Sequence, residues 1–146
     1  MWPDHRIQNL LGIEHPIIQA PMAGAGASEM VIAVSDAGGL GSLPCAMLSP
    51  EQVRTELGII RQRTSRPINL NFFCHRLPRA DPARMAAWKQ RLEPYYVELG
   101  LDPNAPVPQA TRAPFDGTMC DLVEEFTPEV VSFHFGLPER EGCWSG

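Results

Sequence analysis

A run of small residues at positions 19–24 is the part of the sequence best suited to receiving a flat ligand. The stretch reads Gln-Ala-Pro-Met-Ala-Gly, and residues without bulky side chains let a planar group approach the backbone closely. Pro21 makes the turn rigid and removes one backbone donor. The amide and carbonyl groups of Ala20, Met22 and Ala23 are then left to face the polar edge of such a ring. The competing interpretation is a plain tight turn into a helix, and composition alone favours it.

Two asparagines and a histidine form the second group of candidate residues. Asn69 and Asn71 alternate with apolar residues, so the strand period of two places both amides on one face. Buried amides must be hydrogen-bonded, and the partner is either a ligand's polar edge or phosphate, or else water and backbone. His134 lies between Phe133 and Phe135 and is predicted to face the side opposite to both. A hydrogen-bonded core histidine is the commoner arrangement, and a ligand-site role is the alternative.

The glycines and cysteines carry weaker signals. The stretch at 37–42, Ala-Gly-Gly-Leu-Gly-Ser, fits a helix end packed closely on a strand better than a dinucleotide site, because the G-x-G-x-x-G spacing is missing. The four cysteines form no C-x-x-C pair and are expected to be thiols rather than a disulfide framework; they are Cys45, Cys74, Cys120 and Cys143. Cys74 precedes a histidine, but no second ligand pair has zinc-like spacing, and no metal site is predicted.

Short apolar runs alternate with amphipathic stretches, which predicts βα units and a parallel sheet. Strands are expected at 16–20, 40–43, 68–73 and 130–135, the first of them buried. Helices are expected from a Ser28 cap to about 38, from the Ser49-Pro50 start, from the Asp81-Pro82 start, and over 116–126. The region 77–114 is expected to be an insertion in a single amino-terminal domain over 1–138. Residues 139–146 are expected to be an atypical tail, truncated or frame-shifted, with a naturally disordered tail as the alternative.

Length and composition limit the architecture and the partners. A chain of 146 residues with 44% hydrophobic residues is shorter than the roughly 250 residues of a complete eight-stranded barrel. The predicted fold class is therefore α/β, a partial TIM (β/α)8 barrel of about four βα units. The net charge of -5 and the lack of a basic, aromatic-rich run argue against nucleic acid. No apolar run of about 18 residues or signal-peptide core is present, so no membrane contact and a cytoplasmic location are expected.

Four stretches, in this order along the chain, resemble the nitronate monooxygenase family, formerly called 2-nitropropane dioxygenases. They are G-I-E-H-P-I-I-Q-A-P-M-A-G at 12–24, V-S-D-A-G-G-L-G-S at 34–42, I-N-L-N-F-F at 68–73 and V-S-F-H-F-G-L-P at 131–138. The likeness runs from about Trp2 to Glu139, and the order of the first two stretches makes it specific.

This resemblance implies a TIM barrel that binds FMN non-covalently and oxidises alkyl nitronates with O2 to carbonyl compounds and nitrite. It implies that Pro21, Met22 and Ala23 line the flavin and that Asn71 hydrogen-bonds it. The family's phosphate-binding glycine loops follow its seventh and eighth strands, and its catalytic histidine lies in an A-G-G-H-x-G setting; neither has a counterpart here. His134 is not assigned that catalytic role. The chain alone is therefore expected to be inactive and to retain FMN weakly or not at all.

Two alternatives stay open at this point. One is a non-catalytic half-barrel that acts as a binding or assembly module and self-associates through its open edge. The other is a relative of the flavin-dependent enoyl-acyl carrier protein reductases, which share the barrel and the opening style. The stretch F-H-F-G-L-P at 133–138 favours the nitronate branch.

Overall fold

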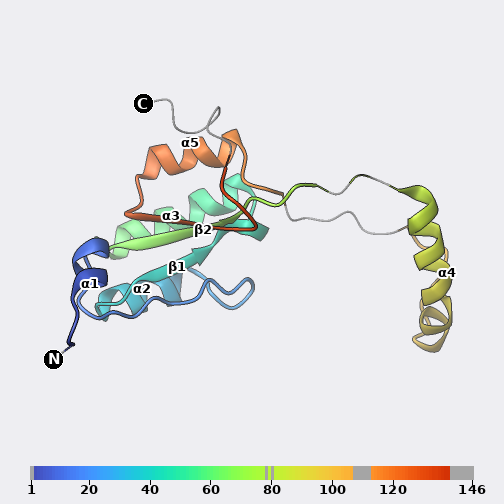
Figure 1. Cartoon of the computed structure of the whole chain (residues 1–146), viewed down its shortest axis with the longest axis horizontal. Coiled ribbons are helices and arrows are strands. Elements are labelled where there is room, and N and C mark those ends of the chain that lie inside the picture. Colours follow the sequence, from blue (N-terminus) through green and yellow to red (C-terminus); the bar gives the residue numbers. More distant parts are fainter. Residues whose placement is uncertain (1, 78, 80, 107–112, 139–146) are drawn as a thin grey trace. The chain divides into compact units, whose positions relative to one another are not determined.

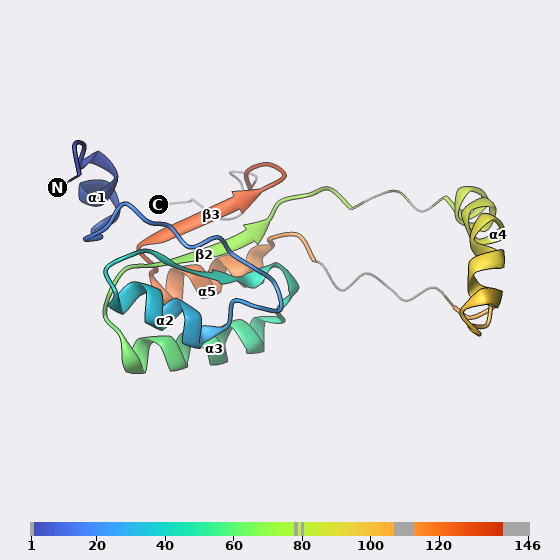
Figure 2. The same cartoon turned by 90° about the horizontal axis from the view of Figure 1, so that it is seen from below.

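The computed structural model describes residues 2–77, 79, 81–106 and 113–138. The chain divides into two compact units, one formed by Met1–His75 with Arg112–Gly146 and the other by Arg76–Thr111. Figure 1 labels the five α-helices of the described residues and the strands β1 and β2, and Figure 2 labels β3. The tail at 139–146, for which a truncated or frame-shifted end was predicted, lies outside the described residues.

A parallel sheet forms the centre of the first unit. Its strands are β1 (Gly41–Pro44), β2 (Ile68–Phe73) and β3 (Val130–His134), in the spatial order β1-β2-β3. The register pairs Ser42 with Asn69 and Asn71 with Ser132. The remaining elements of this unit are α1 (Arg6–Leu11), α2 (Ser28–Asp36), the 3-10 turn η1 (Cys45–Met47), α3 (Pro50–Arg63) and α5 (Gly117–Phe126). Figure 2 shows α2, α3 and α5 on the same side of the sheet.

The apolar core lies between the sheet and these helices. Leu43, Leu70 and Phe72 point into it from the strands and are at most 2% exposed. Helix α3 contributes its apolar face through Val53, Leu57 and Ile60, all fully buried. The strand alternation therefore turns Ser42, Asn69 and Asn71 to the opposite face of the sheet, as predicted for the two asparagines.

Local signals explain where most of these elements begin. Ser49 caps α3 in a capping box with Gln52, and Pro50 occupies the first turn, which stabilises a helix start by satisfying backbone amides. Asp116 caps α5 through the Met119 amide at 3.0 Å. The predicted strands at 68–73 and 130–135 correspond to β2 and β3.

Three expectations from the sequence are wrong. The buried first strand at 16–20 is reduced to one bridge between Ile18 and Leu40, and Ile18 is 51% exposed, because the run has a strand neighbour on one edge only within the described residues. Ser28 does not cap α2; Ala27 is the cap residue. Phe135 does not share the face of Phe133, since its positive φ of 68° ends the strand there. Helix α1 was not predicted at all, because the sequence around it carries no strong start signal.

The second unit is built around one long helix, α4 (Pro82–Glu98), capped by the Asp81 side chain on the Arg84 amide at 2.9 Å. No residue of α4 is buried. The chain then turns back, since Lys89 Nζ donates to the Ala105 carbonyl at 2.9 Å. Among the described residues, no helix combines the length and the hydropathy needed to cross a bilayer.

Candidate functional site

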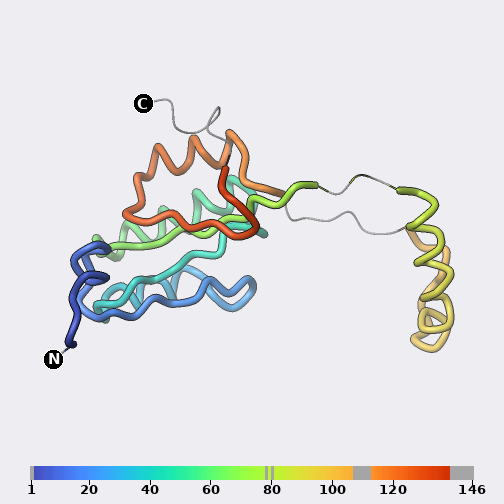
Figure 3. Tube along the Cα trace, in the orientation of Figure 1, coloured from blue at the N-terminus to red at the C-terminus, as the bar shows by residue number. Residues whose placement is uncertain are grey.

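The bend at 19–24 leaves the sheet because proline interrupts the pairing with β1. The Gln19 amide donates to the Leu40 carbonyl at 2.9 Å and the Leu40 amide to the Ile17 carbonyl at 2.9 Å, as in a parallel ladder. The next rung would need a donor at residue 21, and Pro21 has none. The Gln19 side chain replaces it: Oε1 accepts from the Ser42 amide at 3.0 Å and Nε2 donates to the Ser42 carbonyl at 3.3 Å. The buried groups of Ser42 are thus satisfied while the main chain diverges (Figure 3).

Beyond Pro21 the bend closes on itself through one carbonyl. The Met22 carbonyl accepts from the amides of Ala25 at 3.2 Å and Gly26 at 2.7 Å, and Gly24 adopts a φ of 80°. The Ala20 carbonyl accepts from the Gln19 side chain at 3.2 Å. The carbonyls of Ala20 and Met22, expected to be available to a ligand, are therefore already engaged within the bend.

The backbone amides of the same bend are available. Those of Met22 and Ala23 donate to no acceptor among the described residues, and both residues are exposed, with Met22 at 44%. Within the described part of the chain, the residues at 22–25 are all exposed, so the bend is not covered there. Because unpaired backbone donors on an exposed turn suit a ligand with acceptor atoms along one edge, this half of the bend keeps the property predicted from its sequence.

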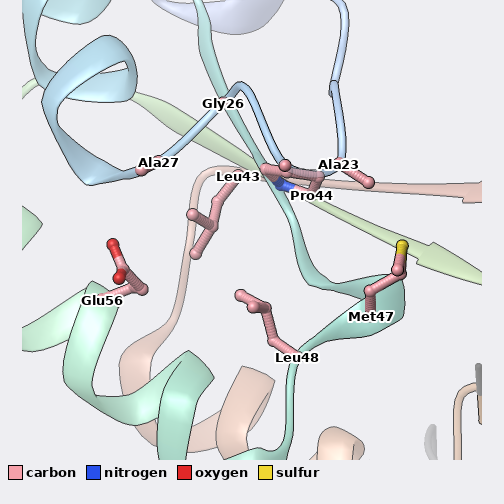
Figure 4. A pocket seen from close by; sticks show the side chains of 9 residues that line it. Ala23, Gly26, Ala27, Leu43, Pro44, Met47, Leu48 and Glu56 are labelled. Carbon is pink, nitrogen blue, oxygen red and sulfur yellow. The ribbon is translucent and has the colours of Figure 1, made fainter. Parts of the chain in front are cut away.

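A pocket of about 290 Å³ lies beneath the bend on the helix side of the sheet. Figure 4 shows its lining from the bend, the end of β1, η1 and α3. Its residues are mostly small or apolar: Ala23, Gly24, Gly26, Ala27, Leu43, Pro44, Met47, Leu48 and Glu56. Glu56 is its one charged residue, and its Oε2 accepts from the Ser28 amide at 3.0 Å. A carboxylate of α3 therefore satisfies the first turn of α2, in place of the cap that the sequence had predicted at Ser28.

The face of the sheet opposite the helices carries a chain of polar side chains toward the carboxyl ends of the strands. Asn69 Nδ2 donates to Ser42 Oγ at 3.0 Å, and Asn69 Oδ1 is buried with no partner among the described residues. Asn71 Nδ2 lies 2.9 Å from Ser132 Oγ and 3.2 Å from His134 Nδ1. Asn71 is only 3% exposed, and its Oδ1 accepts no hydrogen bond from the described residues.

Aromatic rings surround the outer end of this polar chain. Phe73 packs edge-on against His134, with ring centroids 5.9 Å apart, and against Phe135 at 5.0 Å. His75 completes the group at 6.3 Å from the Phe73 ring. The positive φ of Phe135 is what turns this ring toward Phe73 rather than into the core. His134 is exposed, so its ring lies at the rim of the sheet and not in a sealed interior.

Cys45 follows β1 directly, next to Pro44, which lines the pocket. Burial raises the pKa of its thiol to about 12, against a smaller opposing effect of the hydrogen bond from the Asn71 backbone. The thiol therefore stays protonated at neutral pH and is unsuited to nucleophilic chemistry.

Comparison with known proteins decides the family. The family model "Nitronate monooxygenase" matches residues 4–144. The chain belongs to the nitronate monooxygenase family. It is 42% identical over 137 residues to a nitronate monooxygenase of Pseudomonas aeruginosa, covering 93% of this chain and 39% of that protein. It is 41% identical over 133 residues to one of Paraburkholderia phytofirmans, covering 90% and 36%.

The fold agrees with this family. The structure of a nitroalkane oxidase from Streptomyces ansochromogenes superposes with a TM-score of 0.73 at 28% identity, covering 92% of this chain and 37% of that one. The α/β fold with a parallel sheet is thus shared. The chain spans about two fifths of the length of the nitronate monooxygenases it matches.

The structure brings together only part of the residues predicted for this nitronate monooxygenase family site. Ala23 lines the pocket beneath the bend, whereas Pro21, Met22 and Asn71 do not. Asn71 instead joins His134 and Ser132 on the face of the sheet opposite the helices. Sequence reasoning missed Gln19, Ser42 and Ser132. Ser42 and Ser132 were detectable in principle, because they have the same alternation phase as the asparagines they pair with.

Proposed function

We propose that this chain provides the amino-terminal, flavin-facing part of an FMN-dependent nitronate monooxygenase. The reaction proposed for the whole protein is the oxidation of alkyl nitronates by O2 to carbonyl compounds and nitrite, within a TIM barrel. Family membership supports the reaction class. The observation that carries the assignment of the site is the bend after Gln19, which stays open and keeps the amides of Met22 and Ala23 unpaired within the described chain.

The residues present fit the polar edge of a flavin ring. The two amides of the bend are donors, and Asn71 Oδ1 is an acceptor left over after Asn71 Nδ2 is engaged by Ser132 and His134. A flavin ring carries both carbonyl acceptors and an N–H donor along one edge, so this donor and acceptor set matches it. Pro21, Met22, Ala23 and Asn71 are therefore the residues proposed to hold FMN. When bound, FMN supplies a ring that accepts electrons from the substrate and passes them to O2.

The chain's own residues position the ring site rather than perform proton transfer. Ser132 and His134 fix the Asn71 amide so that its Oδ1 points away from them. The Gln19 side chain holds the bend at the end of β1. No residue of this chain is proposed as the catalytic base, and none is assigned to the phosphate.

A chimera tests the proposed reaction. Residues 4–138 of this chain replace the matching region of the Pseudomonas aeruginosa nitronate monooxygenase, with which the chain shares 42% identity. The chimera is expected to consume O2 in the presence of an alkyl nitronate and to release nitrite. Ala23→Phe in the chimera is expected to abolish flavin binding, whereas Ala25→Phe, on the exposed neighbouring residue, preserves it. A folded, flavin-loaded chimera without nitronate turnover would overturn the proposed reaction.

A second experiment tests the site in the 146-residue chain itself. FMN and lumiflavin, which lacks the phosphate, are titrated against the chain and followed by flavin fluorescence. If only the ring is contacted, both bind weakly with similar affinity, and Ala23→Phe reduces both. FMN binding that is stoichiometric and much tighter than that of lumiflavin would show a phosphate site here, and nitronate turnover by the chain alone would contradict its expected inactivity.

A further inference from the structure

Helix α4 and its C-cap residue carry an apolar seam that is exposed within the described part of its unit. Large apolar residues recur at alternating spacings of three and four: Met85, Trp88, Leu92, Tyr95 and Leu99. All five are between 41% and 72% exposed. Spacing of this kind places them in one line along a helix, as at the a and d positions of a coiled coil. The seam is defined here as these five residues.

The chain that follows α4 covers a different side of the helix. Lys89 and Tyr96 are its partly covered residues; Lys89 Nζ donates to the Ala105 carbonyl and the Tyr96 carbonyl accepts from the Leu101 amide at 2.8 Å. The returning segment therefore lies along the Lys89 side and leaves the seam open. Exposed apolar lines of this length on a helix typically mark a contact surface.

The charges of α4 are placed against its own dipole. Its first turn has no acid and contains Arg84, and its last turn has no base and ends with Glu98. A helix alone is stabilised by the reverse arrangement. Neither Arg84 nor Glu98 forms an ion pair with another described residue. A second helix running antiparallel would place each of these charges beside an opposite charge.

We propose that two copies of this chain associate through antiparallel α4 helices, seam against seam. A two-fold axis between Trp88 and Leu92 places Trp88 of one copy beside Leu92 of the other, and Met85 beside Tyr95. Large and smaller side chains then alternate along the contact. Arg84 of each copy lies next to Glu98 of the other, which forms two ion pairs related by the axis. Such a self-complementary contact closes as a dimer.

A parallel arrangement fits the same residues less well. In parallel register the flanking positions set Arg84 against Lys89 of the other helix, two like charges, and Trp88 directly against Trp88. In the antiparallel arrangement the basic residues near the axis are already engaged within their own chain. Arg91 lies over the Trp88 ring at 5.6 Å, and Lys89 is bound to the Ala105 carbonyl. The Arg84 and Glu98 positions thus favour the antiparallel pair over the parallel one.

The test measures the mass of the full 146-residue chain by sedimentation across a range of concentrations. We expect a concentration-dependent dimer of twice the monomer mass. Leu92→Asp is expected to abolish it, whereas Ala87→Asp, on the opposite side of α4, leaves it intact. Arg84→Glu and Glu98→Arg are each expected to weaken the dimer at least tenfold, and the double variant to restore it. Glu93→Arg, which makes the same charge change off the contact, is the matched control.

A second surface has to be separated from this one, because the exposed edge at Ile17 and Ile18 could also join copies. Ile18→Lys is expected to leave the α4 dimer unchanged. A monomer at all concentrations, a dimer that survives Leu92→Asp, or a double charge reversal that fails to restore association would each overturn the proposal. Circular dichroism of every variant confirms that helix content is retained, so loss of folding is not mistaken for loss of the contact.

Discussion

Helices α3 and α4 begin in the same way and end up in opposite environments. Both have a side-chain cap and a proline in the first turn, and they contain 14 and 17 residues. Helix α3 buries three aliphatic residues against the sheet, whereas α4 buries none. The comparison teaches that start signals fix where a helix forms, while burial depends on the surface that lies beside it.

The largest effect is expected from matched leucines of the two helices. Leu57→Ala in α3 removes a fully buried side chain and should lower the free energy of unfolding by about 2–5 kcal/mol. Leu92→Ala in α4, where the side chain is 41% exposed, should change it by less than about 0.5 kcal/mol in dilute solution. Urea unfolding of the full chain measures both. Equal losses at the two sites would show that α4 belongs to the same core.

The next effect concerns side-chain amides. Gln19→Ala leaves the amide and carbonyl of the fully buried Ser42 without their partners, and should cost about 1–3 kcal/mol. The counterpart is Gln90→Ala on the exposed surface of α4, which is expected to be neutral. Urea unfolding again provides the measurement, and a neutral Gln19→Ala would mean that water replaces the side chain.

Removing the helix caps tests the same difference between α3 and α4. Ser49→Ala removes the capping box of α3 and should destabilise the first unit by about 1 kcal/mol. Asp81→Ala removes the equivalent cap of α4, where we expect faster amide hydrogen exchange in α4 and no change in the unfolding of the first unit. Exchange rates that rise in both units for either variant would contradict their independence.

The smallest effect is a pH dependence confined to the first unit. Burial pushes the pKa of Glu129 upward, but hydrogen bonds from the Ile68 amide, from its own backbone and from Arg61 outweigh this, so the net pKa lies below the ordinary 4.5. A lowered pKa in the folded state stabilises the fold above pH 4.5, and this contribution disappears as the pH falls through the folded-state value. Unfolding measured between neutral and acidic pH should therefore be less steeply pH-dependent in Glu129→Gln.

The sequence was sufficient to predict an element where the signal for that element is local. Strand β2 follows from the alternation around Asn69 and Asn71, and α3 from Ser49 and Pro50. It failed where the deciding partner is distant in sequence. The cap of α2 comes from Glu56 on α3. The predicted first strand is cut short after Gln19, because the side chain of Gln19, and not the main chain, hydrogen-bonds to Ser42.

At the candidate site, too, local features were predictable from the sequence and contacts between distant residues were not. The composition of the bend predicted a turn of small residues, but which of its carbonyls are engaged depends on the folded path of the chain. The contact of Asn71 with His134 joins residues 63 positions apart, and only the register of β2 and β3 reveals it. The orientation of Phe135 follows from its positive φ. An aromatic residue rarely adopts such a φ, and no sequence pattern predicted it.

Pro21 also determines which part of the opening segment hydrogen-bonds to β1: the main chain or the Gln19 side chain. Any residue with an amide proton at this position would let the main chain continue alongside β1 and compete with the Gln19 side chain for the Ser42 carbonyl. The opening segment would then exchange between an attached and a diverging path. Because Pro21 has no amide proton to offer, it favours the diverging path even without a ligand.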